Sequence, residues 1–516
     1  MPASLFDDYP NRERSFRSRL LELKSPANRG TGSLNSRRLW LSVVNGPEMD
    51  ILLVSSEIAP WVQHSGVAEV VASFSKTLKH VGHSVTVVVP YSDAYEAAGL
   101  LLARRLTPIK IEGHEGLTVF DTQLTSGVGL SLLSLGSAVN GRRDVMSAAL
   151  FARAVAALIK ERQGLGLRTD IVHVQDWFGG LVALALDMVE GQRPPVVVSI
   201  YNVGQQGNIA SSSEARATLG PMGEMPQLSV GSELNILAAA MRTASCVTTV
   251  SDTYATMLGD PSVSGQLAQV VHELKTPMLG IPGGIDYARY NPAIDPLLVA
   301  RYDAEDFSQK GTCKTALQRE LGLELDLNCP MLFVLGPLGD DLGGRLAVGS
   351  LSKMLDQPLS LVVAAQSGDN AEMADSVRQL AQKWPKQVAL LAVDSPQGIH
   401  RALSAADFVL LTTEQSPLDS YHLFAQRYGA LPVAISTGLF ASSLVDCDSK
   451  LETGDAFLFE DATIDALAGA VARAVTAWGR PEFDRLRRRT MRKDLGWERP
   501  TRRMLQVYRQ ILGIRL

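Results

Sequence analysis

Short apolar runs alternate with longer amphipathic segments along most of this chain, and this alternation limits its fold more than any other feature. From residue 50 onward the runs are rich in β-branched residues, mostly four to six residues long, and apolar at successive positions. Such runs are typical of parallel strands that are covered on both faces of a sheet. The runs occupy residues 51–54, 85–89, 171–174, 196–200 and 247–250, and then 331–335, 359–364, 388–393, 408–411 and 432–435.

The segments between the runs predict helices. Residues 68–80, 145–162 and 371–384 have helical length and the spacing of an amphipathic helix. Because the strand–helix alternation occurs twice and 516 residues exceed one ordinary core, we predict an α/β protein with two doubly wound domains. Ligands bind such sheets outside the carboxyl ends of the strands, so we expect a cleft between two such edges.

Proline and glycine mark the predicted limit between the domains. The pattern is interrupted at Thr276-Pro277 and again at Ile281-Pro282-Gly283-Gly284, and these residues punctuate both helices and strands. Near the end of the chain, residues 499–514 form an arginine-rich amphipathic pattern, which predicts a helix docked through its apolar face. We therefore predict a first domain at residues 49–277, a second domain at 278–495, and a final segment at 496–516.

The first 48 residues differ in composition from the rest of the chain. Among serine, asparagine, proline and glycine they carry eight basic residues, which are Arg12, Arg14, Arg17, Arg19, Lys24, Arg29, Arg37 and Arg38. We expect residues 1–48 to be a flexible basic arm. Alternatively, Met49 is the true start, because the folded pattern begins one residue later. An intact-mass measurement on the native protein distinguishes the two.

Composition excludes several classes of protein. A hydrophobic content of 46% with 20% charged residues is typical of a globular chain, and a net charge of −5 argues against a general electrostatic grip on nucleic acid. The four cysteines are scattered without a CxxC pair or a Cys/His cluster, which argues against a metal site and favours a reducing compartment. No apolar run approaches the roughly 18 to 20 residues of a membrane span. We expect a cytoplasmic protein.

Polar residues follow several predicted strands of the first domain, where the cleft would lie. The loop after residues 51–54 leads through Gly66 into a helix, and such a turn suits a phosphate because backbone N–H groups approach the anion. Asp176 follows the third run and Asn202 follows the fourth. These residues could face the cleft, or they could simply cap their loops.

The second half offers fewer candidates. Gly368 and Asp369 follow one predicted strand, and His400 follows the next. His400 could lie in the cleft or be a surface histidine with satisfied hydrogen bonds. The sequence shows no Ser/His/Asp order, P-loop or metal-ligand spacing, so residue types and spacing alone leave the chemistry open.

Several stretches, in order and with matching spacing, resemble bacterial glycogen synthases and plant starch synthases. The first begins DILLVSSEIAP and the second, DIVHVQDW, is similar to the His-Asp-Trp element of that family. The resemblance covers residues 49–516. The stretches lie at residues 50–60, 170–177, 247–255, 284–302, 425–438 and 478–481, followed by the final helix.

This resemblance implies a GT-B fold, in which two Rossmann-like domains face a central cleft and a C-terminal crossover helix returns to the first domain. Residues 49–277 would be the acceptor side and residues 278–495 the nucleotide-sugar side. Family members transfer glucose from ADP-glucose to the non-reducing end of an α-1,4-glucan, with retention of configuration and without a metal. The implied partners are an α-1,4-glucan and a protein of glycogen metabolism, with no nucleic acid and no membrane.

The chain departs from the family at five working positions of the cleft. Gln63 stands where the family has the lysine of its phosphate loop, and Tyr201 stands where it has the histidine of a His-Asn pair. Pro337 and Leu342 replace the two cations that bind the diphosphate, and Ser416 replaces the catalytic glutamate. The cations would stabilise the charge that develops on departing ADP, and the carboxylate would position the glucose.

Other cleft positions keep the residues of the family. They are Glu57, Gly66, Asp176, Asn202, Gly368, Asp369, His400, Tyr428, Thr437 and Gly438. Two residues near the lost groups are potential replacements. Glu414 would need a rearranged loop to replace the missing glutamate, and Arg345 lies about one helical turn beyond Leu342.

Loss of a single transition-state donor costs about 10²- to 10³-fold in rate, and this chain lacks the cations and the carboxylate together. The sequence therefore predicts a catalytically impaired homologue with weakened ADP-glucose binding, which binds glucan or regulates glycogen metabolism. The alternative is an active glycosyltransferase that uses ADP-glucose or another nucleotide sugar.

Overall fold

The computed structural model describes residues 47–111, 114, 116–136, 140, 142–336, 338–339, 342–366, 368–412 and 420–514. Residues from Met49 to Arg515 belong to one compact unit. The predicted arm at residues 1–48 lies almost entirely outside the described residues, so it stays a prediction.

The first domain is built on a mostly parallel sheet, whose described residues form nine strands in the order β12-β11-β7-β6-β1-β2-β5-β4-β3. The pairs from β12 to β5 are parallel, and only β5–β4 and β4–β3 are antiparallel. The strands are β1 (Asp50–Val54), β2 (Ser84–Pro90), β3 (Ala103–Arg104), β4 (Thr118–Gln123), β5 (Gly129–Ser134), β6 (Ile171–Gln175), β7 (Val196–Ile200), β11 (Cys246–Thr249) and β12 (Leu279–Gly280).

All five strands predicted in this half are present, each within one residue of its predicted ends. Strands β4 and β5 were not predicted, because β4 alternates with partly exposed positions and β5 begins at a glycine and contains serines. A small antiparallel sheet is separate from the main one. It comprises β8 (Asn208–Ala210), β9 (Ser229–Val230) and β10 (Glu233–Asn235).

The second domain contains a sheet of six parallel strands in the order β15-β14-β13-β16-β17-β18 among the described residues. The strands are β13 (Met331–Val334), β14 (Ser360–Ala365), β15 (Val388–Ala392), β16 (Phe408–Leu411), β17 (Leu431–Ile435) and β18 (Phe457–Phe459). Only β18, with three residues, was not predicted. The α/β fold class is confirmed.

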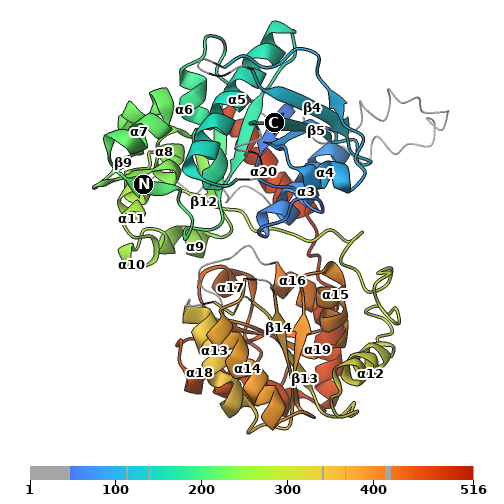
Figure 1. The fold of residues 1–516 in the computed structure, drawn as a ribbon. Helices are drawn as coiled ribbons and strands as arrows, with labels where there is room; N and C mark the ends of the chain where they lie inside the picture. The colour runs from blue at the N-terminus through green and yellow to red at the C-terminus, as the bar shows by residue number, and fades with distance from the viewer. Residues whose placement is uncertain are drawn as a thin grey trace, which may run out of the picture. The chain divides into compact units, whose positions relative to one another are not determined.

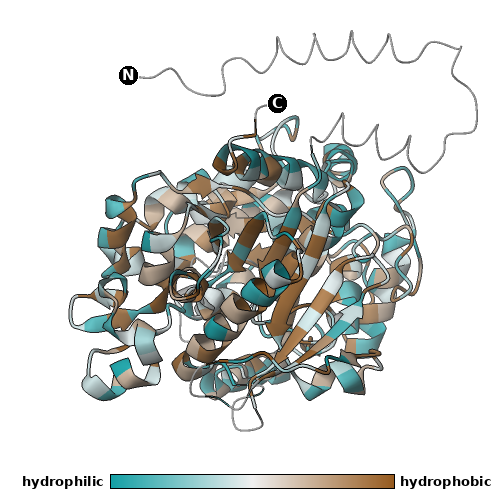
Figure 2. Ribbon diagram, turned by 90° about the horizontal axis from the view of Figure 1, so that it is seen from above, coloured by the Kyte–Doolittle hydropathy of each residue, from teal (hydrophilic) through white to brown (hydrophobic). Residues whose placement is uncertain are grey.

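Helices cover these sheets, and Figure 2 shows apolar strands inside a more polar layer of helices. The predicted helices are confirmed at their N-terminal ends to within one residue. The helices are α3 (Val67–His80), α4 (Asp93–Ala97), α5 (Val145–Gly164), α6 (Val182–Asp187), α7 (Ser213–Thr218), α8 (Ile236–Thr243), α9 (Asp252–Met257), α10 (Pro261–Ser264), α11 (Leu267–Glu273), α12 (Lys310–Leu321), α13 (Leu342–Met354), α14 (Ala371–Lys383), α15 (Pro396–Ala405), α16 (Tyr421–Arg427), α17 (Gly438–Ser443), α18 (Ile464–Ala477), α19 (Pro481–Met491) and α20 (Glu498–Ile511).

The last helix, α20, belongs to the core of the first domain, although it follows the second domain in sequence. Figure 1 shows it in red beside the blue helix α3. Met504, Leu505 and Tyr508 are buried in the first hydrophobic core, and the Tyr508 hydroxyl lies 2.6 Å from Nδ1 of His173 on β6. The expected crossover helix is therefore confirmed. The exact limits of the domains stay a prediction.

Candidate cleft between the two sheets

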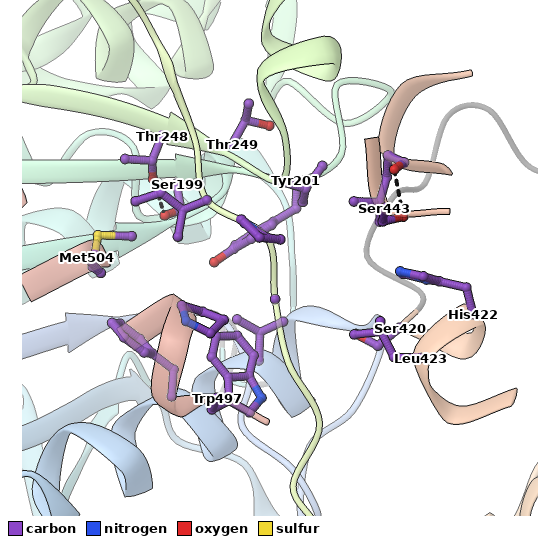
Figure 3. Close-up of a pocket in the computed structure, with 18 of the residues that line it drawn as sticks. Ser199, Tyr201, Thr248, Thr249, Ser420, His422, Leu423, Ser443, Trp497 and Met504 are labelled. Carbon is purple, nitrogen blue, oxygen red and sulfur yellow. Dashed lines mark hydrogen bonds between the residues drawn. The ribbon is translucent and has the colours of Figure 1, made fainter. Parts of the chain in front are cut away.

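A pocket lies where the carboxyl half of the first sheet meets α16, α17 and the start of α20 (Figure 3). It takes side chains from the first domain, from the connection after β12, and from the second domain. The described residues that line it are Val70, Phe74, His173, Ser199, Tyr201, Thr248, Thr249, Val250, Ile281, Pro282, Gly283, Ser420, His422, Leu423, Leu439, Ser443, Trp497, Pro500 and Met504.

A chain of neutral polar groups crosses the floor of this pocket. Nε2 of His173 lies 2.7 Å from Oγ of Ser199, which lies 2.7 Å from Oγ1 of Thr248. Because Tyr508 contacts the other ring nitrogen, both nitrogens of His173 are engaged. Complete burial lowers the pKa of His173 to about 3, so the imidazole is neutral at pH 7. The floor therefore carries polarity without charge.

Tyr201, which we predicted to be a substituted position, forms part of the pocket wall. Its hydroxyl donates to Oε1 of Gln175 at 2.8 Å, and its backbone N–H donates to the Asp176 carboxylate at 2.7 Å. Gln175 is the last residue of β6, which pairs with β7, so this hydrogen bond links the ends of two neighbouring strands. Sequence reasoning did not find this pair, because no spacing rule relates the ends of β6 and β7.

Asp176 and Asn202 organise the loops at the end of the first sheet. One carboxylate oxygen of Asp176 accepts from the N–H groups of Tyr201 and Asn202, the latter at 3.3 Å, and Oδ1 of Asn202 accepts from Gly204 N–H at 2.8 Å. Burial raises the pKa of Asp176 to about 7, although its two backbone hydrogen bonds oppose the shift. Neither residue is among the described residues that line the pocket; both cap backbone.

Glu57 has the same kind of task in the loop after β1. Its buried carboxylate accepts from the N–H groups of His64 and Ser65, the second at 3.1 Å, and from the Ser65 hydroxyl. These bonds shape the turn that reaches Gly66, the residue before α3. Gln63 is exposed in this loop and lines a different cavity. The Glu57 carboxylate is therefore occupied by hydrogen bonds within its own loop.

His400 is neither a cleft residue nor a surface histidine. It is 2% exposed, its Nδ1 lies 2.7 Å from the Asp295 carboxylate, and its ring stacks on Tyr290 at 4.8 Å between centroids. The Tyr428 hydroxyl donates to the same carboxylate at 2.5 Å. Hydrogen bonds from His400 and Tyr428 help to lower the pKa of Asp295, against burial, which raises it. The retained His400 and Tyr428 thus belong to a buried network of the second domain.

Four further predicted cleft positions lie in loops or at the start of a helix in the second domain. Gly368 has a left-handed φ of +94°, and Asp369 accepts from the N–H groups of Leu338 and Gln366 at 3.0 and 2.8 Å, which ties two loops together. Thr437 directly precedes α17. The Gly438 carbonyl accepts from Oγ of Ser251 at 3.5 Å, a contact between α17 and the first domain.

The other predicted substitutions lie mostly outside the described residues. Pro337 and Ser416, and also Glu414, lie outside the described residues. Leu342 is the first residue of α13, and its side chain is likewise outside the description. Arg345 is exposed on that helix and does not line the pocket as far as the described residues define it.

No Asp, Glu, Lys or Arg occurs among the described residues that line the cleft pocket. Within the same part of the chain, the buried Nε1 of Trp497 has no hydrogen-bond partner. A Cβ at Gly283 would lie 3.7 Å from the Trp497 ring, so this glycine lies against the indole. Phe74 and Trp497, whose ring centroids are 5.8 Å apart, were not predicted, because they enter from helices far apart in sequence.

The described residues contain no group of three or more His, Cys, Asp or Glu side chains that could hold a metal ion. No helix in this part of the chain is long and apolar enough to span a membrane.

Known proteins share this architecture. The chain matches the model of the starch synthase catalytic domain over residues 50–273. It is 31% identical to a glycogen synthase of Thioalkalivibrio sulfidiphilus, with 90% of this chain and 100% of the relative covered. It is also 31% identical to glycogen synthase 1 of Methylococcus capsulatus, over 90% of this chain and 97% of the relative.

Among solved structures, the catalytic domain of starch synthase IV from Arabidopsis thaliana, bound to ADP and acarbose, superposes with a TM-score of 0.78. That pair shares 22% identity and covers 90% of this chain and 100% of the other. Two Rossmann-like sheets with a crossover helix define a glycosyltransferase fold of the GT-B class. Within that class, identity of 31% along nearly the full length shows that the chain belongs to the glycogen synthase family.

Proposed function

We propose that this protein is a catalytically impaired member of the glycogen synthase family that binds α-1,4-glucan or regulates glycogen metabolism in the cytoplasm. The observation that carries the proposal is the uncharged cleft: its described lining contains no acidic residue and no lysine or arginine. We further propose that the protein uses no metal or other cofactor and interacts with neither nucleic acid nor membrane.

The chemistry of the family explains why this observation matters. Transfer from ADP-glucose expels a nucleoside diphosphate, and stabilising its developing charge requires preorganised positive groups. His173 cannot supply positive charge, because burial holds it neutral. Tyr201, at the position where the resemblance places a histidine, is hydrogen-bonded to the neutral side chain of Gln175. These features support binding without transfer.

The cleft retains surfaces that suit a neutral sugar. Phe74 and Trp497 offer aromatic faces, and the Trp497 indole N–H is a donor without a partner among the described residues. Sugar sites commonly combine apolar walls with a few fixed polar groups. These features favour a neutral sugar over a charged ligand, and we propose the end of an α-1,4-glucan.

Co-sedimentation with glycogen, combined with a transfer assay using radiolabelled ADP-glucose, tests the proposal. We expect the protein to sediment with glycogen and to incorporate no label above a blank, while an active glycogen synthase assayed in parallel incorporates it. Trp497→Phe should weaken sedimentation, because it removes the donor but keeps the ring. Robust glucose incorporation would overturn the proposal.

A second candidate is an active transferase that uses ADP-glucose or another nucleotide sugar. The observation that favours it is the match to glycogen synthases along 90% of the chain. Calorimetric titration with ADP-glucose, ADP and UDP-glucose separates the two candidates. Binding of one of them followed by glucosyl transfer would establish the second candidate, and absence of binding to all three would exclude it for these donors.

A further inference from the structure

A second cavity, of about 300 Å³, lies at the carboxyl edge of β1 and β2 in the first domain. These strands are parallel neighbours, so the loops that follow them emerge at the same edge, where α/β sheets bind ligands. The cavity is formed by the loop after β1, the start of α4, and the residues before α5. Its lining is Ser56, Trp61, Val62, Gln63, His64, Pro90, Tyr91, Ser92, Ala94, Arg142 and Arg143.

The charge of this cavity contrasts with that of the cleft pocket. Two arginines line it, and its described lining contains no carboxylate. Arg142 is paired at 2.6 Å with Asp144, the residue that caps α5. The buried Nε of Arg143 has no hydrogen-bond partner among the described residues, and the guanidinium interacts electrostatically with the Asp176 carboxylate outside the lining. A buried guanidinium nitrogen without an acceptor is costly, which indicates that Arg143 serves a ligand.

Two aromatic side chains give the cavity a braced wall. The Trp61 ring lies 6.3 Å from the ring of Tyr95, and Tyr91 stacks on Phe120 at 5.0 Å. Burial, together with Glu96 and Asp93, raises the pKa of Tyr91 to about 12, so its hydroxyl stays protonated at pH 7. Because those two carboxylates lie near Tyr91, the anionic end of a ligand belongs on the opposite side, at the arginines.

We propose that this cavity binds a sugar monophosphate, with the phosphate on Arg143 and Arg142 and the sugar ring against Trp61 and Tyr91. Guanidinium groups recognise phosphate through paired, charge-assisted hydrogen bonds. The volume suits one sugar ring and one phosphate. The site does not depend on the proposed function, because it would bind its ligand whether or not glucose is transferred in the cleft.

Titration calorimetry on the full chain tests the proposal with glucose 1-phosphate, glucose 6-phosphate, inorganic phosphate, glucose and ADP-glucose. We expect one sugar monophosphate to bind at least about tenfold more tightly than inorganic phosphate or glucose, with the affinity falling as salt screens the charges. Arg143→Gln should weaken this binding about 10- to 100-fold, because it removes a charge-assisted contact.

A matched control removes the same charge elsewhere. Arg378→Gln alters an exposed residue of α14 that pairs only with Asp375 among the residues that the structure describes, and it should leave binding unchanged. Thermal unfolding of both variants checks that they remain folded. Equal binding of inorganic phosphate, tighter binding of ADP-glucose that Arg143→Gln also weakens, or unchanged binding by Arg143→Gln would each overturn the assignment, as would absence of binding to every probe.

Discussion

The amino edge of the second sheet and the carboxyl edge of the first sheet differ in their charged side chains. Asp407, directly before β16 at the amino edge of the second sheet, binds Nζ of Lys314 at 2.7 Å and the Arg487 guanidinium at 2.9 Å. All three side chains are at least nine-tenths buried. At the carboxyl edge of the first sheet, where transferase chemistry takes place in this class, the described lining of the cleft pocket is uncharged.

This difference shows where the described structure buries charged side chains. Buried ions remain where backbone and partner groups satisfy them: Lys314 also donates to the Cys329 carbonyl at 2.6 Å, and Arg487 to the Gly429 carbonyl at 3.0 Å. In the second domain, buried charged side chains stabilise the fold. The described lining of the cleft pocket instead offers neutral hydrogen-bonding groups and aromatic side chains.

The largest expected effect comes from breaking the ionic cluster. Asp407→Asn keeps the shape of the side chain but leaves two buried cations without their anion, so we expect a loss of about 3–5 kcal/mol in the free energy of unfolding. Urea denaturation followed by circular dichroism measures it. A loss below about 1 kcal/mol would show that the carbonyl oxygens alone satisfy the two cations.

The neutral chain in the cleft predicts a pH dependence. The pKa of His173 is about 3 in the folded protein and about 6.5 when unfolded, so the unfolded state binds more protons between these values. Stability should therefore fall as the pH drops from about 6.5 towards 3, by up to about 1.4 kcal/mol per pH unit from this group.

His83 contributes in the same direction, because burial lowers its pKa to about 4. The informative quantity is therefore the difference between wild type and His173→Gln, measured by urea denaturation at several pH values. The variant should lose less stability in acid. Identical pH profiles would mean that the pKa of His173 is the same in the folded and unfolded states.

A smaller effect is expected at the other end of the same chain. Tyr508→Phe removes the hydroxyl that contacts Nδ1 of His173 and leaves that buried nitrogen without its partner, which costs about 1–3 kcal/mol. Thermal unfolding measures the change. Because the ring is kept, a loss well above this range would point to a disturbed α20 instead.

The smallest effect belongs to the surface. Arg378→Gln breaks an exposed pair within α14, with both side chains more than half exposed, so the change in unfolding free energy should stay within about 0.5 kcal/mol. Comparing this variant with Asp407→Asn separates two contributions to the loss of unfolding free energy. One is the removal of a charge, and the other is leaving buried cations without their anion. A large loss here would undermine that separation.

Much of the fold was predictable because buried parallel strands have a local sequence pattern, a short apolar run. The run at 196–200, for example, is apolar at nearly every position and was assigned to its exact ends. β4 and β5 escaped because one is partly exposed and the other interrupted by serine. In the cleft, Tyr201 was correctly placed at the end of a strand, whereas Gln175, Phe74 and Trp497 were not singled out.

The sequence by itself determined the α/β fold class and the family, because these depend on local patterning and on motifs in order. Only the tertiary structure decided what the retained residues do. Glu57, Asp176 and His400, which we predicted as cleft residues, are bound to backbone or to buried partners. Hydrogen bonds across many residues of separation, such as that between His173 and Tyr508, depend on how helices dock, and no local pattern encodes that geometry.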